Sequence, residues 1–309
     1  MLTAFAVCSQ NYPTRPIRFI VPYTPGGLGD TFARAVGQGL SERMGQPVVI
    51  DNRPGASQAI GAEATAKAAP DGYTLFLGTQ SGLVLNTIAK KSLPYDPLSD
   101  FAPISMLFTT PLYLVVHPSV PAKSVQELIA AARARPGKYT FASIGPGSSL
   151  HLAGEMFRKR AGVDIVHVPY KGSSPAITDL LSGQVDMMFE GGVSALPHVR
   201  SGKLRALATT GRKRAEAMPQ LPTMAEAGLP GFDVTAWFGL VAPAKVPRPI
   251  IERLNREVGE ILRTGALKEK FAAAGIDITP GTPEELGQRI REDLPYWTQV
   301  MRDAGIQPE

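Results

Sequence analysis

The sequence predicts an α/β protein in two units, each built on a largely parallel β-sheet. Short apolar segments of strand length alternate with segments of helix length along most of the chain. Three of the strand-like segments run into a glycine-bearing loop that is followed by a helix. The sheet is expected to change near residues 109–113 and again near 231–234. This pattern puts the first and last parts of the chain in one domain.

The predicted domains are discontinuous in sequence. Domain 1 comprises residues 12–110 together with 233–309, and domain 2 comprises residues 111–232. A chain of 309 residues with 44% hydrophobic residues is long enough to bury two cores. No run of about 18 apolar residues occurs, so no membrane-spanning helix is expected.

Charge and cysteine usage exclude several classes of protein. The net charge is +5, but the basic clusters at 158–160 and 212–214 are short and carry no interleaved aromatic residues. We therefore interpret them as solvated surface and expect no nucleic-acid partner. Cys8 is the single cysteine, which excludes an internal disulfide and any metal or redox motif with several cysteines.

Residues 1–11 are uncharged and have two interpretations. They resemble the tail of a secretory signal that lacks its basic start and its full apolar core, as in a truncated leader. The alternative is a frayed N-terminal tail. The preceding residues 5–7 also make Cys8 a poor lipoprotein site.

The first strand, loop and helix form the unit around which the prediction is built. Residues 17–21 have the length and apolarity of a buried strand, which Pro22 ends. Prolines and glycines at 25–29 then favour a turn with bare main-chain N–H groups, and a helix is expected from about Asp30. Free amides and a helix N-terminus together favour a carboxylate or phosphate. A turn with a purely structural role is the open alternative.

Similar units are expected further along the chain. Strands are predicted at residues 45–51, 74–77, 112–116, 139–142, 165–170, 183–189, 204–208 and 235–242, and helices at 56–69, 125–135, 150–160, 176–182, 249–262 and 283–302. Open α/β sheets bind ligands beyond the carboxyl ends of their strands. If two such sheets face each other, the loops at 23–30, 78–82, 143–149 and 170–175 converge on one cleft.

Few patterns in the sequence point to catalysis. No Gly-x-Ser-x-Gly motif is present, and the four histidines show no metal-ligand spacing. The alternative function is a nicotinamide-dependent oxidoreductase, because Gly27-x-Gly29 follows a strand and Asp51 ends the next one. The third glycine of that motif is missing, however, and Phe32 occupies a position that favours Gly or Ala. We therefore predict no enzyme, no cofactor and no metal site.

A series of short motifs resembles one known family over nearly the whole chain. The motifs are YPTRPIRFIVPYTPGG at 12–27, NRPG at 52–55, PDGYTL at 70–75, YDP at 95–97, VPYKG at 168–172, GQVD at 183–186 and PTMAEAG at 222–228. Their order resembles the Bordetella uptake gene (Bug) family, the periplasmic solute-binding proteins of tripartite tricarboxylate transporters. The resemblance implies a two-domain Venus flytrap of the second periplasmic binding-protein type, closing on a small organic carboxylate.

The resemblance also implies where the ligand binds. In that family, loops after the first and fifth strands hold one carboxylate, and here they match residues 23–30 and 143–149. The predicted ligand-binding residues, from these loops and their neighbours, are Tyr23, Pro25, Gly26, Gly27, Leu28, Asp30, Thr79, Ser81, Ser143, Gly147, Ser148, Ser149, Lys171, Gly172 and Glu190. Lys171 either adds to the positive field of the cleft or points to solvent. Tyr23, Phe189, Trp237 and Phe238 either line the cleft or pack in the core.

The expected function is a non-catalytic, periplasmic receptor for a dicarboxylate, an acidic amino acid or an aromatic acid. Its expected partners are the membrane components of such a transporter, and the receptor itself is expected to be a monomer. Two features depart from the family pattern. The leader is incomplete, and the apolar residues at Leu28 and at 83–85 favour a ligand whose distal end is less polar.

Overall fold

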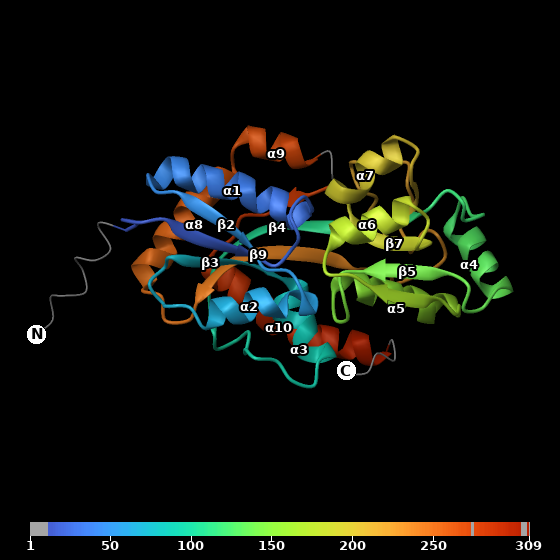
Figure 1. Ribbon diagram of the computed structural model, residues 1–309, viewed down its shortest axis with the longest axis horizontal. Helices are drawn as coiled ribbons and strands as arrows, with labels where there is room; N and C mark the ends of the chain where they lie inside the picture. The colour runs from blue at the N-terminus through green and yellow to red at the C-terminus, as the bar shows by residue number, and fades with distance from the viewer. Residues whose placement is uncertain (1–11, 273–274, 304–307, 309) are drawn as a thin grey trace, which may run out of the picture.

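The computed structural model describes residues 12–272, 275–303 and 308. Two lobes lie side by side along the long axis of the molecule (Figure 1). The predictions for residues 1–11, including Cys8, fall outside the described residues. Within the described part of the chain, no helix is both long enough and apolar enough to cross a membrane.

Ten strands and ten α-helices make up the described structure. The strands are β1 (Ile17–Val21), β2 (Val48–Asn52), β3 (Thr74–Thr79), β4 (Phe101–Val116), β5 (Thr140–Ser143), β6 (Val166–Pro169), β7 (Met187–Gly191), β8 (Arg205–Thr209), β9 (Thr235–Pro243) and β10 (Asp277–Ile278). The helices are α1 (Leu28–Met44), α2 (Ala59–Ala66), α3 (Asn86–Ala89), α4 (Val125–Ala134), α5 (Ser149–Ala161), α6 (Ser173–Leu181), α7 (Gly192–Arg200), α8 (Arg248–Leu262), α9 (Gly265–Ala272) and α10 (Pro283–Asp303), with a 3₁₀ turn at Ala56–Gln58 and a π turn at Ser81–Leu85.

The strands follow the order β2-β1-β3-β9-β4-β7-β5-β6, and β8 and β10 each pair with β4. The outer groups are parallel, as predicted: β1 pairs with β2 and β3, and β5 pairs with β6 and β7. The centre differs from the prediction, because β9 runs antiparallel to both β3 and β4, and β4 runs antiparallel to β7. The sheet is therefore mixed.

Strand β4 connects the two lobes. Its residues from Phe101 to Pro111 pair with β9, whereas Leu112 to Val116 pair with β7. The sequence predicted a strand only at 112–116, because Pro103 and Pro111 resemble strand breakers. The pairing register with β9 shifts just after Pro103, so the long strand continues past this proline. The change of sheet was expected at 109–113 and occurs here, inside one continuous strand. The exact domain limits, 110/111 and 232/233, stay a prediction.

Strand β1 is apolar apart from Arg18, because helices cover both of its faces. Ile17, Phe19 and Val21 belong to a hydrophobic cluster that also contains residues of α1 and α8, whereas Ile20 belongs to a second cluster with residues of α2. Figure 1 shows α1 and α2 on opposite sides of the sheet. Because both faces are covered, the apolar side chains of the strand are buried on whichever face they lie.

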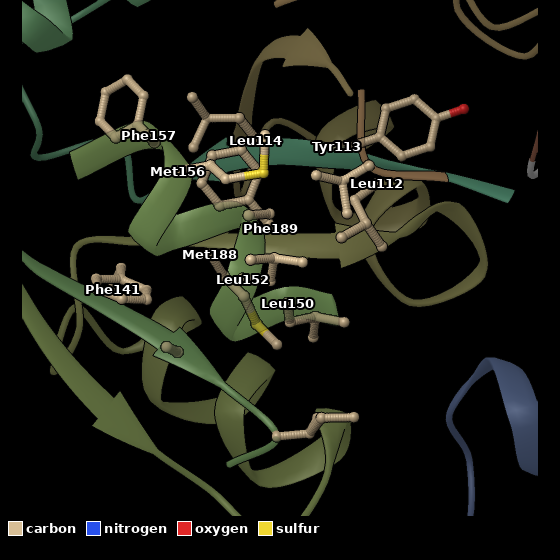
Figure 2. Close-up of a cluster of buried hydrophobic side chains, with 14 of the residues drawn as sticks. Leu112, Tyr113, Leu114, Phe141, Leu150, Leu152, Met156, Phe157, Met188 and Phe189 are labelled. Atoms are coloured by element: carbon tan, nitrogen blue, oxygen red, sulfur yellow. The ribbon is translucent and has the colours of Figure 1, made fainter. Parts of the chain in front are cut away.

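The second lobe has its own packed centre. Figure 2 shows Leu114, Met156 and Phe189 gathered where helix α5 crosses the strands. Phe141 of β5 lies against the same helix, and a methyl group on Gly154 would come within 2.1 Å of its ring. Helix α5 approaches the sheet this closely because residue 154 has no side chain.

Several predicted boundaries were wrong. The helix predicted at 56–69 begins only at Ala59, because Ala56, Ser57 and Gln58 all have positive φ. The loop predicted at 78–82 is the end of β3 followed by the π turn. Helix α7 was not predicted, since Gly191, Gly192 and Pro197 are typical of loops, and Glu190 lies inside β7 rather than after it.

Candidate functional site

A small cavity lies between the two lobes. Its volume is about 30 Å³, which is room for roughly two water molecules. The lining residues are Tyr23, Leu28, Gly29, Thr110, Leu112, Ile144, Ser149, Leu150, Ser173, Glu190, Gly191, Ala236 and Phe238. Four come from β4 and β9, the strands that pass from one lobe to the other. Glu190 and Gly191 are the last two residues of β7, and the rest come from loops and helix starts at strand carboxyl ends.

Four helices begin at the wall of this cavity. Leu28 is the first residue of α1, Ser149 the first of α5 and Ser173 the first of α6, and Gly191 is the N-cap of α7. The N-terminus of a helix carries a partial positive charge and unpaired N–H groups. Among the described residues, none that lines the cavity is Lys, Arg or His. The helix N-termini, and no side-chain cation of the described chain, are therefore the groups at this wall that favour an anion.

Asp30 shapes the loop between β1 and α1 rather than the cavity wall. Its carboxylate is 3% exposed and accepts hydrogen bonds from Gly26 N at 2.9 Å, from Asn52 Nδ2 at 2.8 Å and from Arg34 Nε at 3.0 Å. Burial alone would raise the pKa of Asp30, but these donors hold it below its usual value. Because the Gly26 N–H donates to Asp30, it stabilises the loop and is not an unpaired donor at the cavity.

A buried glutamine holds Tyr23 against the cavity. Gln58 Nε2 donates to the Tyr23 hydroxyl at 2.9 Å, and Gln58 Oε1 accepts from the Thr79 hydroxyl. A methyl group on Gly29 would lie 2.4 Å from the Tyr23 ring, so the ring occupies the space above the α1 turn. Gln58 was missed because its left-handed backbone, with φ of 82°, has no signature in the sequence.

Direct contacts hold the two lobes together beside the cavity. Ser149 N donates to Ser81 Oγ at 2.9 Å, and Ser174 Oγ donates to the Pro25 carbonyl at 2.9 Å. The hydroxyl of Ser57 also donates to the Pro146 carbonyl. The lobes are therefore shut, and a ligand larger than two waters requires them to separate.

The loop at 143–149 is supported by two neutral histidines. His167 Nε2 and Ser143 Oγ are 2.6 Å apart, Gly147 N donates to His151 Nδ1 at 3.3 Å, and the two imidazole rings lie 4.2 Å apart. Burial lowers the pKa of each histidine to about 4. Ser148 Oγ accepts from His151 N at 3.2 Å and so caps α5.

The predicted site residues fall into two groups. Tyr23, Leu28, Ser149 and Glu190 line the cavity. The others hold the loops, make contacts between the lobes or lie at the surface: Pro25, Gly26, Gly27, Asp30, Thr79, Ser81, Ser143, Gly147, Ser148, Lys171 and Gly172. Their part in ligand binding stays a prediction.

Of the two interpretations of Lys171, the structure favours solvent, because the side chain is exposed and does not line the cavity. Among the aromatic residues, Tyr23 and Phe238 line the cavity, whereas Trp237 and Phe189 are fully buried in the core. Thr110, Ile144 and Ser173 are lining residues that sequence reasoning missed. Ile144 and Ser173 lie inside the predicted cleft loops at 143–149 and 170–175, and Thr110 lies at the predicted change of sheet, so their positions were the available signal.

The geometry does not favour the nicotinamide alternative. Asp51 does not line the cavity and is paired with Arg18 and Arg53, so its carboxylate is already engaged. Burial raises the pKa of Asp51, but hydrogen bonds from these two guanidinium groups hold it below its usual value. The Tyr23 ring fills the space above Gly29, where a pyrophosphate would have to approach.

Comparison with known proteins gives a consistent result. The model of the tripartite tricarboxylate transporter family receptor, TctC, matches residues 32–306. The chain belongs to this receptor family. Relatives of this chain include protein BugT of Bordetella pertussis, which is 43% identical over 98% of this chain and 93% of the length of BugT. The Bug resemblance stated from the sequence motifs is thereby confirmed.

Solved structures confirm the two-domain Venus flytrap fold of this TctC-family chain. R. palustris Rpa4515 with adipate shares 37% identity and a TM-score of 0.93, covering 96% of this chain and 100% of its own. The periplasmic binding protein BugD shares 32% identity and a TM-score of 0.93, with the same coverage.

Proposed function

We propose that this protein is a periplasmic receptor that binds a small organic carboxylate and delivers it to the membrane components of a tripartite tricarboxylate transporter. It acts as a monomer and without catalysis. The ligand classes that fit are dicarboxylates, acidic amino acids and aromatic acids. Membership of the receptor family supports this role, as does the adipate bound to the 37% identical Rpa4515.

One observation carries the proposal: four helix N-termini meet at a cavity that no Lys, Arg or His lines among the described residues. A helix N-terminus stabilises an anion by about 0.3–1 kcal/mol, and by about 2 kcal/mol where it is partly buried. Hydrogen bonds to a charged group add about 1.5–3 kcal/mol each. These contributions together are sufficient for micromolar binding, which corresponds to about 8 kcal/mol.

Isothermal titration calorimetry tests the receptor proposal. The panel comprises dicarboxylates of four to six carbons, aspartate, glutamate, nicotinate and terephthalate. At least one is expected to bind and to raise the melting temperature, because the ligand stabilises only the folded chain. No heat and no thermal shift across the panel would contradict the proposal, and stoichiometric quenching of NADH fluorescence would favour the oxidoreductase.

Ser149→Ala tests the site with whichever ligand binds. The variant removes a hydroxyl from the cavity wall at the start of α5 and should weaken carboxylate binding roughly tenfold, which is about 1.4 kcal/mol. Ser182→Ala is the matched control, because Ser182 is exposed and its hydroxyl donates to the Asp179 carbonyl outside the cavity. Equal affinity in the wild type and Ser149→Ala would remove Ser149 from the site.

A further inference from the structure

Glu190 is a buried acid that lines the cavity and has one oxygen without a hydrogen-bond partner in the described part of the chain. It lies in β7 opposite Tyr113 of β4, and 3% of it is exposed. Its Oε1 accepts a hydrogen bond from Gly191 N at 2.7 Å. Its Oε2 has no hydrogen-bond partner among the described residues, although it is fully covered. Since Glu190 lines the cavity, its carboxyl group lies beside the space where a ligand would bind.

A buried carboxyl group in this state needs either a donor or a proton. Burial raises the pKa of Glu190 to about 7. The Gly191 amide opposes this rise only in part, as does the nearby Ser173 hydroxyl, which is not in hydrogen-bonding geometry with Oε2. Buried charges in proteins are normally paired. No cationic side chain of the described residues lines this cavity, so a cation for Glu190 would have to come with the ligand.

The cavity therefore presents two kinds of wall. The starts of α1, α5 and α6 favour a carboxylate, whereas Glu190 repels one, because two carboxylates at one site cannot both stay ionised without cost. An ammonium group would pair with Glu190. The rings of Tyr23 and Phe238 also line the cavity, and aromatic faces attract cations.

We propose that Glu190 makes the receptor selective for carboxylates that carry an ammonium group at their other end, over dicarboxylates of the same length. The proposal rests on the carboxylate-receptor function above and narrows its ligand class. The helix ends bind the carboxylate of the ligand, and Glu190 Oε2 accepts a hydrogen bond from its ammonium group.

Matched ligand pairs test this selectivity by calorimetry at pH 7.5. The pairs are 3-aminopropanoate with succinate, 4-aminobutyrate with glutarate, and 5-aminopentanoate with adipate, in which only the second charged group differs. In the pair that binds best, the wild type should bind the amino acid at least tenfold more tightly than the matching dicarboxylate. Glu190→Gln should abolish or reverse this preference, because the amide keeps the shape and removes the charge.

Glu155→Gln is the matched control. Glu155 is also a buried glutamate, at 9% exposed, but it pairs with Arg158 Nη2 at 2.6 Å and does not line the cavity. Its variant should keep the wild-type preference. The proposal would be overturned if the wild type preferred the dicarboxylates. It would also be overturned if Glu190→Gln kept the same preference for amino acids as the wild type. Binding of no carboxylate at all would instead overturn the receptor function.

A second measurement uses the wild type alone, so it does not depend on whether the variants fold. Binding of the amino acid should release protons, because the ammonium group favours ionised Glu190, and affinity should rise roughly tenfold from pH 6 to pH 8. Titrations in two buffers of different ionisation enthalpy count these protons. Proton uptake, or affinity that falls with rising pH, would contradict the proposal.

The neighbouring titratable groups do not change charge in that range. Burial raises the pKa of Tyr23 on the α1 side and raises that of Tyr113 on β4 to about 12, so both phenols stay neutral. Burial lowers the pKa of His151 on α5 and of His167 on β6 to about 4, so both imidazoles stay neutral as well. The ligand ammonium, with an ordinary pKa of about 10, stays charged.

Discussion

Individual residues at this site act mostly through the loops that they hold. Asp30 and Ser148 are buried in loops where a ligand was expected, yet their oxygens are bonded to the main chain and side chains beside them. A Gly-rich loop needs such anchors, because glycine loses more conformational entropy on folding than any other residue. Of the predicted site residues, only Tyr23, Leu28, Ser149 and Glu190 line the cavity.

The histidine pair predicts a dependence of stability on pH. A histidine that stays neutral in the folded state binds fewer protons than the unfolded chain between pH 6.5 and about 4. The free energy of unfolding should therefore fall as the pH falls from 7 to 4.5. His167→Gln should reduce this loss, because one of the two groups no longer titrates. The expected size is roughly 1–2 kcal/mol, since solvent screens the partly exposed ring.

Urea unfolding at both pH values measures the effect. Glu190, whose pKa is raised, contributes the opposite slope, since it stabilises the fold most at low pH and loses that contribution as the pH rises through about 7. Glu190 is present in both proteins, so its effect cancels in the comparison. His198→Gln is the control, and the same pH dependence in His167→Gln as in the wild type would contradict the role of the pair.

At the level of elements, helix α5 depends on how closely it approaches β5. A methyl group at Gly154 would be 2.1 Å from the Phe141 ring, well inside any normal contact. Alanine is the better helix former by about 1 kcal/mol. Overpacking costs about 1–3 kcal/mol, so packing should outweigh propensity.

Gly154→Ala is therefore expected to lower the free energy of unfolding by up to about 2 kcal/mol. Gly265→Ala in α9 is the control, because a methyl group there meets nothing within 4 Å and should be neutral or slightly stabilising. The midpoints of denaturant unfolding measure both changes. Equal midpoints for the two variants would show that α5 can move away from the strand.

At the scale of the whole molecule, the starts of α1 and α6 bring the two lobes close enough for a cross-link. Gly27 at the start of α1 and Ser173 at the start of α6 belong to different lobes, and a Cβ on Gly27 would lie 3.8 Å from that of Ser173. This distance is the usual Cβ separation in a disulfide. Gly27 has φ of −80°, which a cysteine adopts without strain.

Gly27→Cys with Ser173→Cys, in a chain that also carries Cys8→Ser, should form a disulfide that locks the lobes shut. Because the shut cavity has room only for about two waters, the oxidised protein should give no binding heat. A reductant should restore binding to the level of the two proteins that carry only Gly27→Cys or only Ser173→Cys. Binding by the fully oxidised protein would show that ligands enter without separation of the lobes.

Much of this architecture was predictable from local pattern. The strands predicted at 17–21 and 74–77, the helix predicted at 125–135 and the loops at strand carboxyl ends follow from apolar runs and from the glycines and prolines that end them. The motif order identified the family, and the family carries the fold. These features depend on neighbours in sequence, so the sequence by itself determined them.

Only the tertiary structure decided which loop residues reach the cavity. Gln58 holds Tyr23 through a left-handed turn, and Glu190 is fully covered with one oxygen free, because segments far apart in the chain close around them. Strand β4 continues through Pro103 and Pro111 because its partners β9 and β7 hold it in place. Burial and pairing across more than a hundred residues have no local signature, so these features depended on the fold.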